Sequence, residues 1–434
     1  MAGWQPLARR EVCPLYRTMV SRPAASPSPD GVPALDEAQR KLLLVLGVAT
    51  FMVGLDGRVV APLLPSIATE FHVSVATAGY LVSGYLLPYG LFQLAYGPLA
   101  DRFGKVRVSA YAMVAFSVGT ALCGLFSSFT GVLLARAFTG AAAAALIPLT
   151  IAYIGEVVPY SRRQASLAML MASSGAAQAF STSAGGLIAV VVSWRDVFPL
   201  LGVLSGGVTL WLLSQMKHEL RPARAVAAPS YRDVLRSQLP TLLGLVLVEG
   251  ALFMGCFPFL SGLLEQRFGL GPLWIGIVLG AGGATQVLVA RLMPRLLSRY
   301  VETELVVIGA VAMGLAYLLS AVAPSPVWVT VGVALLGAGF SICHSTLQTR
   351  ATEVFPAGRG TALSLFAFSL FLGGGTGSLG MGALLERYGY ERGFAFAGVS
   401  FLAFAGWAWR VVRQPTSHGA ELTDSVALPV PPIR

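Results

Sequence analysis

The stretch GPLADRFGKVR, residues 97–107, is a charged turn between two long apolar segments, and it decides the fold. The apolar windows on either side lie near residues 76–98 and 108–128. Each is longer than the roughly 18 apolar residues that indicate a membrane-spanning helix. The stretch therefore predicts two transmembrane helices joined by a short basic loop.

The same pattern of long apolar windows continues along the chain. Of 434 residues, 55% are hydrophobic and only 12% are charged, whereas a soluble protein carries about a quarter charged residues. We therefore expect an all-α membrane protein with twelve transmembrane helices. The predicted spans lie near residues 42–66, 76–98, 108–128, 131–155, 163–191, 197–216, 240–264, 273–294, 304–323, 327–350, 361–385 and 393–412.

The basic residues give the predicted spans an orientation. If the N-terminus is cytoplasmic, 24 of the 30 Lys and Arg residues fall in cytosolic segments, four fall outside and two lie within spans. This asymmetry follows the positive-inside rule, and it accounts for the net charge of +10 without a nucleic-acid partner. We expect a multi-pass protein with both termini cytoplasmic. The excess of Arg over Lys and the abundant Ala favour a bacterial inner membrane.

Two matched pairs of motifs indicate an internal duplication. Glu-Val-Val-Pro at 156–159 and Glu-Val-Phe-Pro at 353–356 are separated by 197 residues, and Asp56-Gly57 and Glu249-Gly250 by 193. The order and similar offsets predict two homologous six-helix halves, which can rock about a midplane site. The predicted domains are a disordered cytosolic tail (1–40), an N-terminal half (41–216), a cytosolic linker (217–239), a C-terminal half (240–413) and a second tail (414–434).

The loop at 97–107 closely resembles the signature of the major facilitator superfamily, in which Gly is followed by Asp-Arg, a second Gly and basic residues. The resemblance covers about residues 40–412 and implies the major facilitator fold, with two pseudo-symmetric halves. In that family this loop is a conformational latch. The resemblance implies that Asp101 meets the helix that begins near Gly360, and that Arg102 or Arg107 pairs with Glu156. The predicted latch residues are Gly97, Asp101, Arg102, Gly104, Lys105, Arg107 and Glu156.

Asp56 and Arg136 are charges inside predicted spans, where a charge is costly and indicates a functional site. Arg136 is followed four residues later by Gly140, which resembles the buried arginine of the family's fourth span. Counted from the outer ends of their spans, both residues lie deep enough for the long arginine side chain to approach Asp56. The alternative is a static structural ion pair.

Asp56 and Glu249 occupy equivalent places in the two halves, so the pseudo-symmetry predicts that both approach a central cavity. Burial in a medium of low dielectric favours the protonated carboxyl group, which suits proton binding and release near neutral pH. Glu249 has no basic partner within its own span, which makes it the better candidate; a neutral structural acid is the alternative. The predicted residues for proton coupling or substrate binding are Asp56, Glu249 and Arg136.

Several other polar or aromatic residues lie within the predicted spans. Arg58 follows Asp56 by about 200° around a helix, so the two cannot both face the cavity, and Arg58 is expected to snorkel or to pair with a neighbouring helix. His344 is a candidate proton carrier, with a structural role as its alternative. The possible cavity-lining residues are Arg58, Tyr85, Tyr89, Gln178, Gln286 and His344.

These features favour a secondary active transporter that exports small hydrophobic or cationic compounds in exchange for protons by alternating access. Span five departs from the drug antiporters it resembles: Gly185-Gly186 is present, but Thr182 replaces a proline, which leaves the direction of coupling open. Uptake or facilitated diffusion of a sugar or organic anion is the alternative, with Arg58 and Arg136 as an anion clamp.

A membrane-embedded enzyme or receptor is the remote alternative. The sequence shows no metal-ligand spacing, no Gly-x-Ser-x-Gly and no phosphate-binding loop, so we expect no enzyme, no catalytic residues, no cofactor and no metal. Its four cysteines form no CxxC pair. The expected partners are a small-molecule substrate, protons and the lipid bilayer, and the protein is expected to be a monomer.

Overall fold

The structure, a computed structural model, describes residues 36–216, 231–355 and 358–413. Within those residues the regular elements are all helices. In the described part of the chain, ten helical segments are long and apolar enough to cross a membrane. One of them, α17 (Arg359–Val412), consists of two helices that meet at Gly389, where φ is 78° and the backbone is not helical. A shorter apolar stretch, Ala176–Val191, belongs to α9. This arrangement is consistent with the twelve predicted spans.

The first half of the bundle contains the helices up to residue 216. Several spans are built from consecutive helices, because short 3-10 turns or breaks interrupt them. The elements are α2 (Glu37–Val59), η2 (Ala61–Leu63), α3 (Leu64–Glu70), α4 (Val75–Ala78), α5 (Tyr80–Phe103), α6 (Lys105–Leu125), α7 (Phe129–Ala143), α8 (Leu146–Val157), α9 (Tyr160–Val191) and α10 (Trp194–Gln215).

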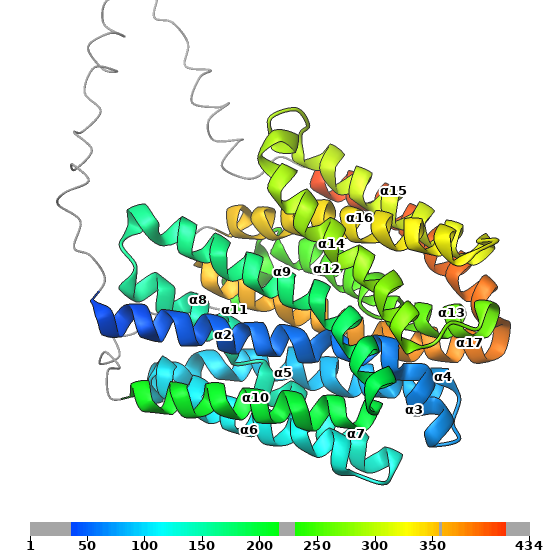
Figure 1. Cartoon of the computed structure of the whole chain (residues 1–434). Coiled ribbons are helices and arrows are strands. Elements are labelled where there is room, and N and C mark those ends of the chain that lie inside the picture. Colours follow the sequence, from blue (N-terminus) through cyan, green and yellow to red (C-terminus); the bar gives the residue numbers. More distant parts are fainter. Residues whose placement is uncertain (1–35, 217–230, 356–357, 414–434) are drawn as a thin grey trace, which may run out of the picture.

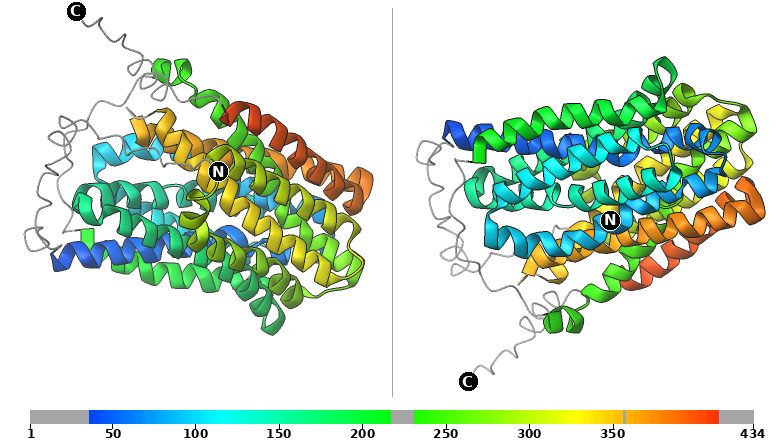
Figure 2. Two further views of the ribbon diagram at one scale, coloured as in Figure 1. Left: turned by 90° about the horizontal axis from the view of Figure 1, so that it is seen from above. Right: turned by 90° about the horizontal axis from the view of Figure 1, so that it is seen from below.

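The second half follows from residue 231, and Figures 1 and 2 show the two halves packed side by side with their helices running along the bundle. Its elements are α11 (Tyr231–Arg236), α12 (Leu239–Phe253), η4 (Phe257–Phe259), α13 (Leu260–Phe268), α14 (Pro272–Leu297), α15 (Glu302–Val322), α16 (Pro326–Val354) and α17.

The predicted boundaries differ from the observed ones near the tails and the linker. α2 begins at Glu37, inside the stretch predicted as a tail, because the side chain of Asp36 caps it and Gln39 completes a capping box. The short helix α11 lies inside the predicted linker. The rest of the predicted tails, and residues 217–230 of the linker, lie outside the described residues.

The two ends of the bundle differ, and we name them by their residues. The basic end carries Lys105, Arg107 and Arg359, where α5 joins α6 and α17 begins. The far end carries Ser74, where α4 begins, and Gly389, where α17 breaks. Most buried apolar residues of each half cluster with their own half, and Ala61, Met254 and Phe371 connect these clusters across the contact between the halves.

Glycines let helices approach closely within each half. A Cβ on Gly140 of α7 would lie 2.2 Å from the carbonyl oxygen of Tyr85 on α5, and a Cβ on Gly250 of α12 would lie 2.1 Å from the carbonyl oxygen of Leu370 on α17. Small residues at such contacts are how membrane helices gain close packing. The pair α5–α7, spans two and four, is matched in the second half by α14–α16, spans eight and ten, where a Cβ on Gly337 would lie 2.0 Å from the carbonyl oxygen of Gly282.

Replacing Gly140 with alanine should separate α5 and α7, because the new methyl group meets backbone and not a movable side chain. We expect a loss of about 1–3 kcal/mol, the usual range for overpacking. Gly155→Ala is the matched control, since nothing lies within 4 Å of that position. Thermal unfolding in detergent compares the two variants. Equal melting temperatures would contradict the packing described here.

Candidate functional site

A cavity of about 410 Å³ lies between the halves towards the basic end, lined by residues of α5, α6, α8, α16 and α17. Its polar groups include Tyr89 and Gln93 from α5 and His344 and Gln348 from α16, and its wall is otherwise mostly aliphatic and aromatic. Towards the basic end the lining reaches the exposed residue Asp101. Binding sites for small molecules commonly measure about 300–1,000 Å³ and are mainly apolar. The cavity therefore has the size and lining of a small-molecule site.

An aromatic pair joins the two halves in the wall of this cavity. The rings of Tyr89 on α5 and Phe371 on α17 are stacked, with centroids 4.0 Å apart. Both residues line the cavity. Tyr89 therefore lies at the cavity and contacts the opposite half.

Asp56 of α2 and Arg136 of α7 form a buried ion pair, as their depths in the sequence suggested. Arg136 Nη1 donates to Asp56 Oδ2 at 2.8 Å, and the side chains are 1% and 0% exposed. The guanidinium carbon of Arg136 also lies 4.2 Å from the centre of the Tyr85 ring. Asp56 does not line the 410 Å³ cavity, because the ion pair holds it within the first half.

Glu249 of α12 is fully buried and pairs with His344 of α16, whose Nδ1 lies 3.2 Å from Glu249 Oε2. Glu249 itself does not line the cavity, but His344 does. The Glu249 carboxyl group is therefore separated from the cavity by the side chain of His344. The pairing was not predicted, although the duplication carries the signal for it: span one contacts span four through Asp56 and Arg136, so span seven should contact span ten.

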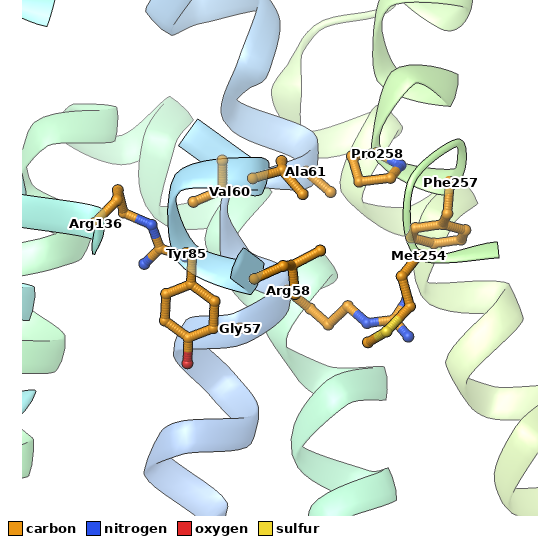
Figure 3. A pocket seen from close by; sticks show the side chains of 11 residues that line it. Gly57, Arg58, Val60, Ala61, Tyr85, Arg136, Met254, Phe257 and Pro258 are labelled. Carbon is orange, nitrogen blue, oxygen red and sulfur yellow. The ribbon is translucent and has the colours of Figure 1, made fainter. Parts of the chain in front are cut away.

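Arg58 of α2 points across to the second half. Its guanidinium carbon lies 5.2 Å from the ring centre of Phe253 and 5.1 Å from that of Phe257. Figure 3 shows it extended towards Met254 and Phe257, while Arg136 lies beside Tyr85. These residues line a second, small cavity of about 30 Å³. Of the two predicted placements, Arg58 therefore contacts neighbouring helices and does not snorkel.

The remaining predicted lining residues divide into two groups. Tyr85 lines the small cavity, where it packs beneath Arg136. Gln178 and Gln286 line neither the 410 Å³ cavity nor the small one beside Arg58, so their role as lining residues stays a prediction. They belong to α9 and α14, and those helices pack against each other.

The loop between α5 and α6 partly has the predicted arrangement. Gly97, Asp101, Lys105 and Gly360 all line the same cavity, so Asp101 shares a cavity wall with the first turn of α17, and the direct contact that the family resemblance implied stays a prediction. Glu156 pairs with Lys105, whose Nζ lies 2.5 Å from Oε1, whereas Arg102 or Arg107 had been expected. The guanidinium carbon of Arg102 lies 5.1 Å from the centre of the ring of Phe103, the next residue in the chain.

The second glycine of this loop, Gly104, is explained by its backbone conformation. Its φ is 96°, a conformation that residues with a Cβ rarely adopt. It ends α5 and begins α6, so the tight connection between these helices depends on it.

Two helical halves that span a membrane around a shared cavity define a membrane transporter. The family model described as Major Facilitator Superfamily matches residues 46–375 and 299–434. The chain belongs to the Major Facilitator Superfamily. The relatives it matches are named as transporters and not as enzymes, which agrees with the prediction from sequence.

Among relatives, the chain is 28% identical over 356 residues to an uncharacterized MFS-type transporter, YceJ, of Bacillus subtilis (strain 168), covering 79% of this chain and 90% of that protein. It is 29% identical over 216 residues to the tetracenomycin C resistance and export protein of Streptomyces glaucescens, covering 49% and 37%.

Solved structures of transporters share the fold. One is a bacterial homolog of the human lysosomal transporter Spinster in an inward-facing, occupied conformation, with a TM-score of 0.71 and 16% identity over 88% of this chain and 98% of that chain. Another is the human organic anion transporter MFSD10, with a TM-score of 0.65 and 17% identity over 85% and 99%.

Proposed function

We propose that the protein is a secondary active transporter that exports small hydrophobic or cationic compounds in exchange for protons, by alternating access. The observation that carries this proposal is the juxtaposition of a mostly apolar cavity with the buried Glu249–His344 pair. A carboxylate held against a histidine inside a membrane protein is an arrangement that can bind and release a proton. Because His344 lies in the cavity wall, substrate and proton would compete for one place.

The chemistry of the cavity supports hydrophobic substrates. Its walls are provided mostly by aliphatic and aromatic side chains, which favour apolar ligands, and the aromatic rings of Tyr89 and Phe371 can also attract a cation. A relative named as a resistance and export protein supports the export direction.

We further propose that the basic end faces the cytoplasm of a bacterial inner membrane, with both termini on that side and the monomer as the working unit. The support is the excess of Lys and Arg in the segments at that end. On this orientation the cavity reaches the cytoplasmic end. A solved structure of similar fold is named as inward-facing.

The far end is where the halves contact each other through polar groups. Glu386 of α17 accepts hydrogen bonds from the hydroxyls of Ser74 at 2.5 Å and Thr77 at 3.3 Å. Ser378 Oγ donates to the carbonyl of Gly79 at 3.2 Å, and Ser183 Oγ to that of Gly276 at 3.2 Å. Alternating access requires these contacts to break when the far end opens.

Glu386→Gln should favour opening of the far end, since an amide is a weaker acceptor than a carboxylate for the two hydroxyls. We expect a change of a few-fold in the open population, because the side chain is exposed and water competes. Spin labels at Thr69→Cys and Arg392→Cys, both exposed at the far end, report the distance between halves by double electron–electron resonance. Glu391→Gln is the control, because Glu391 pairs with Arg267 within the second half. Equal distance distributions in both variants would contradict this role.

Transport by purified protein in proteoliposomes tests the proposed function. The vesicles are equilibrated with ethidium, a hydrophobic cation, at the same concentration on both sides of the membrane, and a pH gradient is imposed with and without a protonophore. We expect ethidium to move against its own gradient in exchange for protons, and the protonophore to abolish this movement. Transport that ignores the pH gradient would refute proton coupling. Proton-driven movement in the same direction as the proton would favour uptake.

A further inference from the structure

A column of stacked rings runs from the contact between the halves to the Glu249–His344 pair. Phe253 and Phe340 are stacked almost in parallel, with centroids 3.8 Å apart and planes at 7°. His344 stacks on Phe340 at 4.7 Å and 17°. Arg58 from the first half lies 5.2 Å from the centre of Phe253 at one end, and Glu249 contacts His344 at the other.

The spacing of residues on two helices builds this column. Phe253 follows Glu249 by four residues on α12, and His344 follows Phe340 by four residues on α16. Residues four apart lie on the same face of a helix. Each helix thus presents one titratable group and one ring on the same face, and the two faces meet.

Arg58 is the member of the column that belongs to the first half. Two rings of the second half, Phe253 and Phe257, lie within 5.2 Å of its guanidinium carbon. Its Nη2 is buried and has no hydrogen-bond partner among the described residues. A buried cation is costly unless it is compensated, and contact with aromatic faces supplies part of that compensation. The free energy of the buried Arg58 side chain therefore depends on where the second half places these two rings.

The charged and titratable groups around the pair are few in the described part of the chain. Cys343 of α16 neighbours Glu249, and the Phe366 ring of α17 lies 5.1 Å from the His344 ring. Across the cavity the lining contains Tyr89, Asp101 and Lys105. Within the column itself, the charged groups are Glu249 at one end and Arg58 at the other, so a change in the charge of His344 changes its electrostatic interaction with both.

We propose that Phe253 and Phe340 are positioning residues that couple the ionisation of the Glu249–His344 pair to the docking of Arg58 between the halves. A protonated His344 binds Phe340 more strongly than a neutral one, because a cation is attracted to the ring face. It also neutralises the buried Glu249. Both effects keep Phe340 and Phe253 in the position in which Arg58 docks on Phe253. They thereby stabilise the conformation with the far end closed.

Loss of the proton leaves Glu249 as an uncompensated buried carboxylate and weakens the stack. Arg58 is then released more easily, and the far end opens. This inference rests on the proposed alternating-access cycle, and it adds a route by which a proton in one half controls contacts with the other.

Distance measurements on full-length protein in nanodiscs, without substrate, test the coupling. The spin labels are those at Thr69→Cys and Arg392→Cys, and the population with the far end open is followed from pH 5 to pH 9. We expect the open population to rise with pH in the parent protein. In Phe340→Leu, which removes the ring, this pH dependence should fall at least about three-fold, and in Phe340→Tyr, which keeps the ring, it should persist.

The control for loss of a buried ring is Phe394→Leu, since Phe394 stacks on Tyr317 at 5.6 Å outside the column. Thermal unfolding identifies any variant that fails to fold. A parent protein without pH dependence, or a folded Phe340→Leu variant with the full pH dependence, would overturn the proposal.

A double-mutant cycle between Arg58→Gln and His344→Gln gives a second readout, because no contact joins these two residues directly. At pH 6 we expect their effects on the open population to be non-additive by about five-fold with Phe340 present, and additive in the Phe340→Leu background. Additivity with Phe340 present would overturn the proposal. The failure of proton-driven ethidium transport would instead refute the proposed function, since neither distance readout requires substrate or a gradient.

Discussion

Arg136→Gln is expected to destabilise the protein by about 3–5 kcal/mol, because it leaves the Asp56 carboxylate buried without its partner. Both side chains are almost completely buried, and Nη1 and Oδ2 are 2.8 Å apart. The arginine also packs on the Tyr85 ring, so its loss removes contacts as well as charge. In thermal unfolding in detergent we expect the melting temperature to fall by at least about 6 °C.

Two variants make this result interpretable. Asp56→Asn combined with Arg136→Gln should recover part of the loss, because it removes both charges. Lys41→Gln, which breaks an exposed pair with Glu37 on one helix, should change stability by less than about 0.5 kcal/mol. If the Arg136→Gln variant has the same melting temperature as the parent protein, the ion pair does not stabilise the first half.

Glu249→Gln is expected to reduce proton-driven transport at least about ten-fold. Exchange of substrate across the membrane without a pH gradient should be retained. Glutamine has nearly the same shape as a protonated glutamic acid but cannot release a proton. Its amide can still contact His344, so the cavity wall should keep its form. Proteoliposomes loaded with ethidium, with and without an imposed pH gradient, separate the two activities.

Glu265→Gln is the matched control, because Glu265 is a half-buried acid of the same half that lies on α13, away from the large cavity. It should keep gradient-driven transport within about two-fold of the parent protein. Full gradient-driven transport by Glu249→Gln would remove Glu249 from the proposed coupling.

The sequence was enough to predict the fold, because hydrophobic length and charge asymmetry are properties of single segments. The windows, the basic loop at 97–107 and the two repeat offsets needed no knowledge of packing. The Asp56–Arg136 contact was also accessible, since depth in a span can be counted from its ends. The observed break of α17 at Gly389 falls between the last two predicted windows.

The site was less predictable, because it depends on which way each helix faces. Gln178 and Gln286 were expected at the cavity, but neither is among the residues that line it; they lie on α9 and α14, which pack against each other. Arg58 was correctly separated from Asp56 by helix geometry, yet its aromatic partners lie about 200 residues away in the chain. The Glu249–His344 contact required the pairing of spans seven and ten, which the duplication implied and the residue types alone did not.

Proton release on substrate binding tests the central claim of proton and substrate exchange most directly. Purified protein in weakly buffered detergent solution is mixed with ethidium at pH 7, and a pH indicator records the protons set free. The account predicts release that saturates with ethidium in the parent protein and is lost in Glu249→Gln, which must still bind ethidium. Ethidium binding without proton release by the parent protein, or equal release by Glu249→Gln, would contradict it.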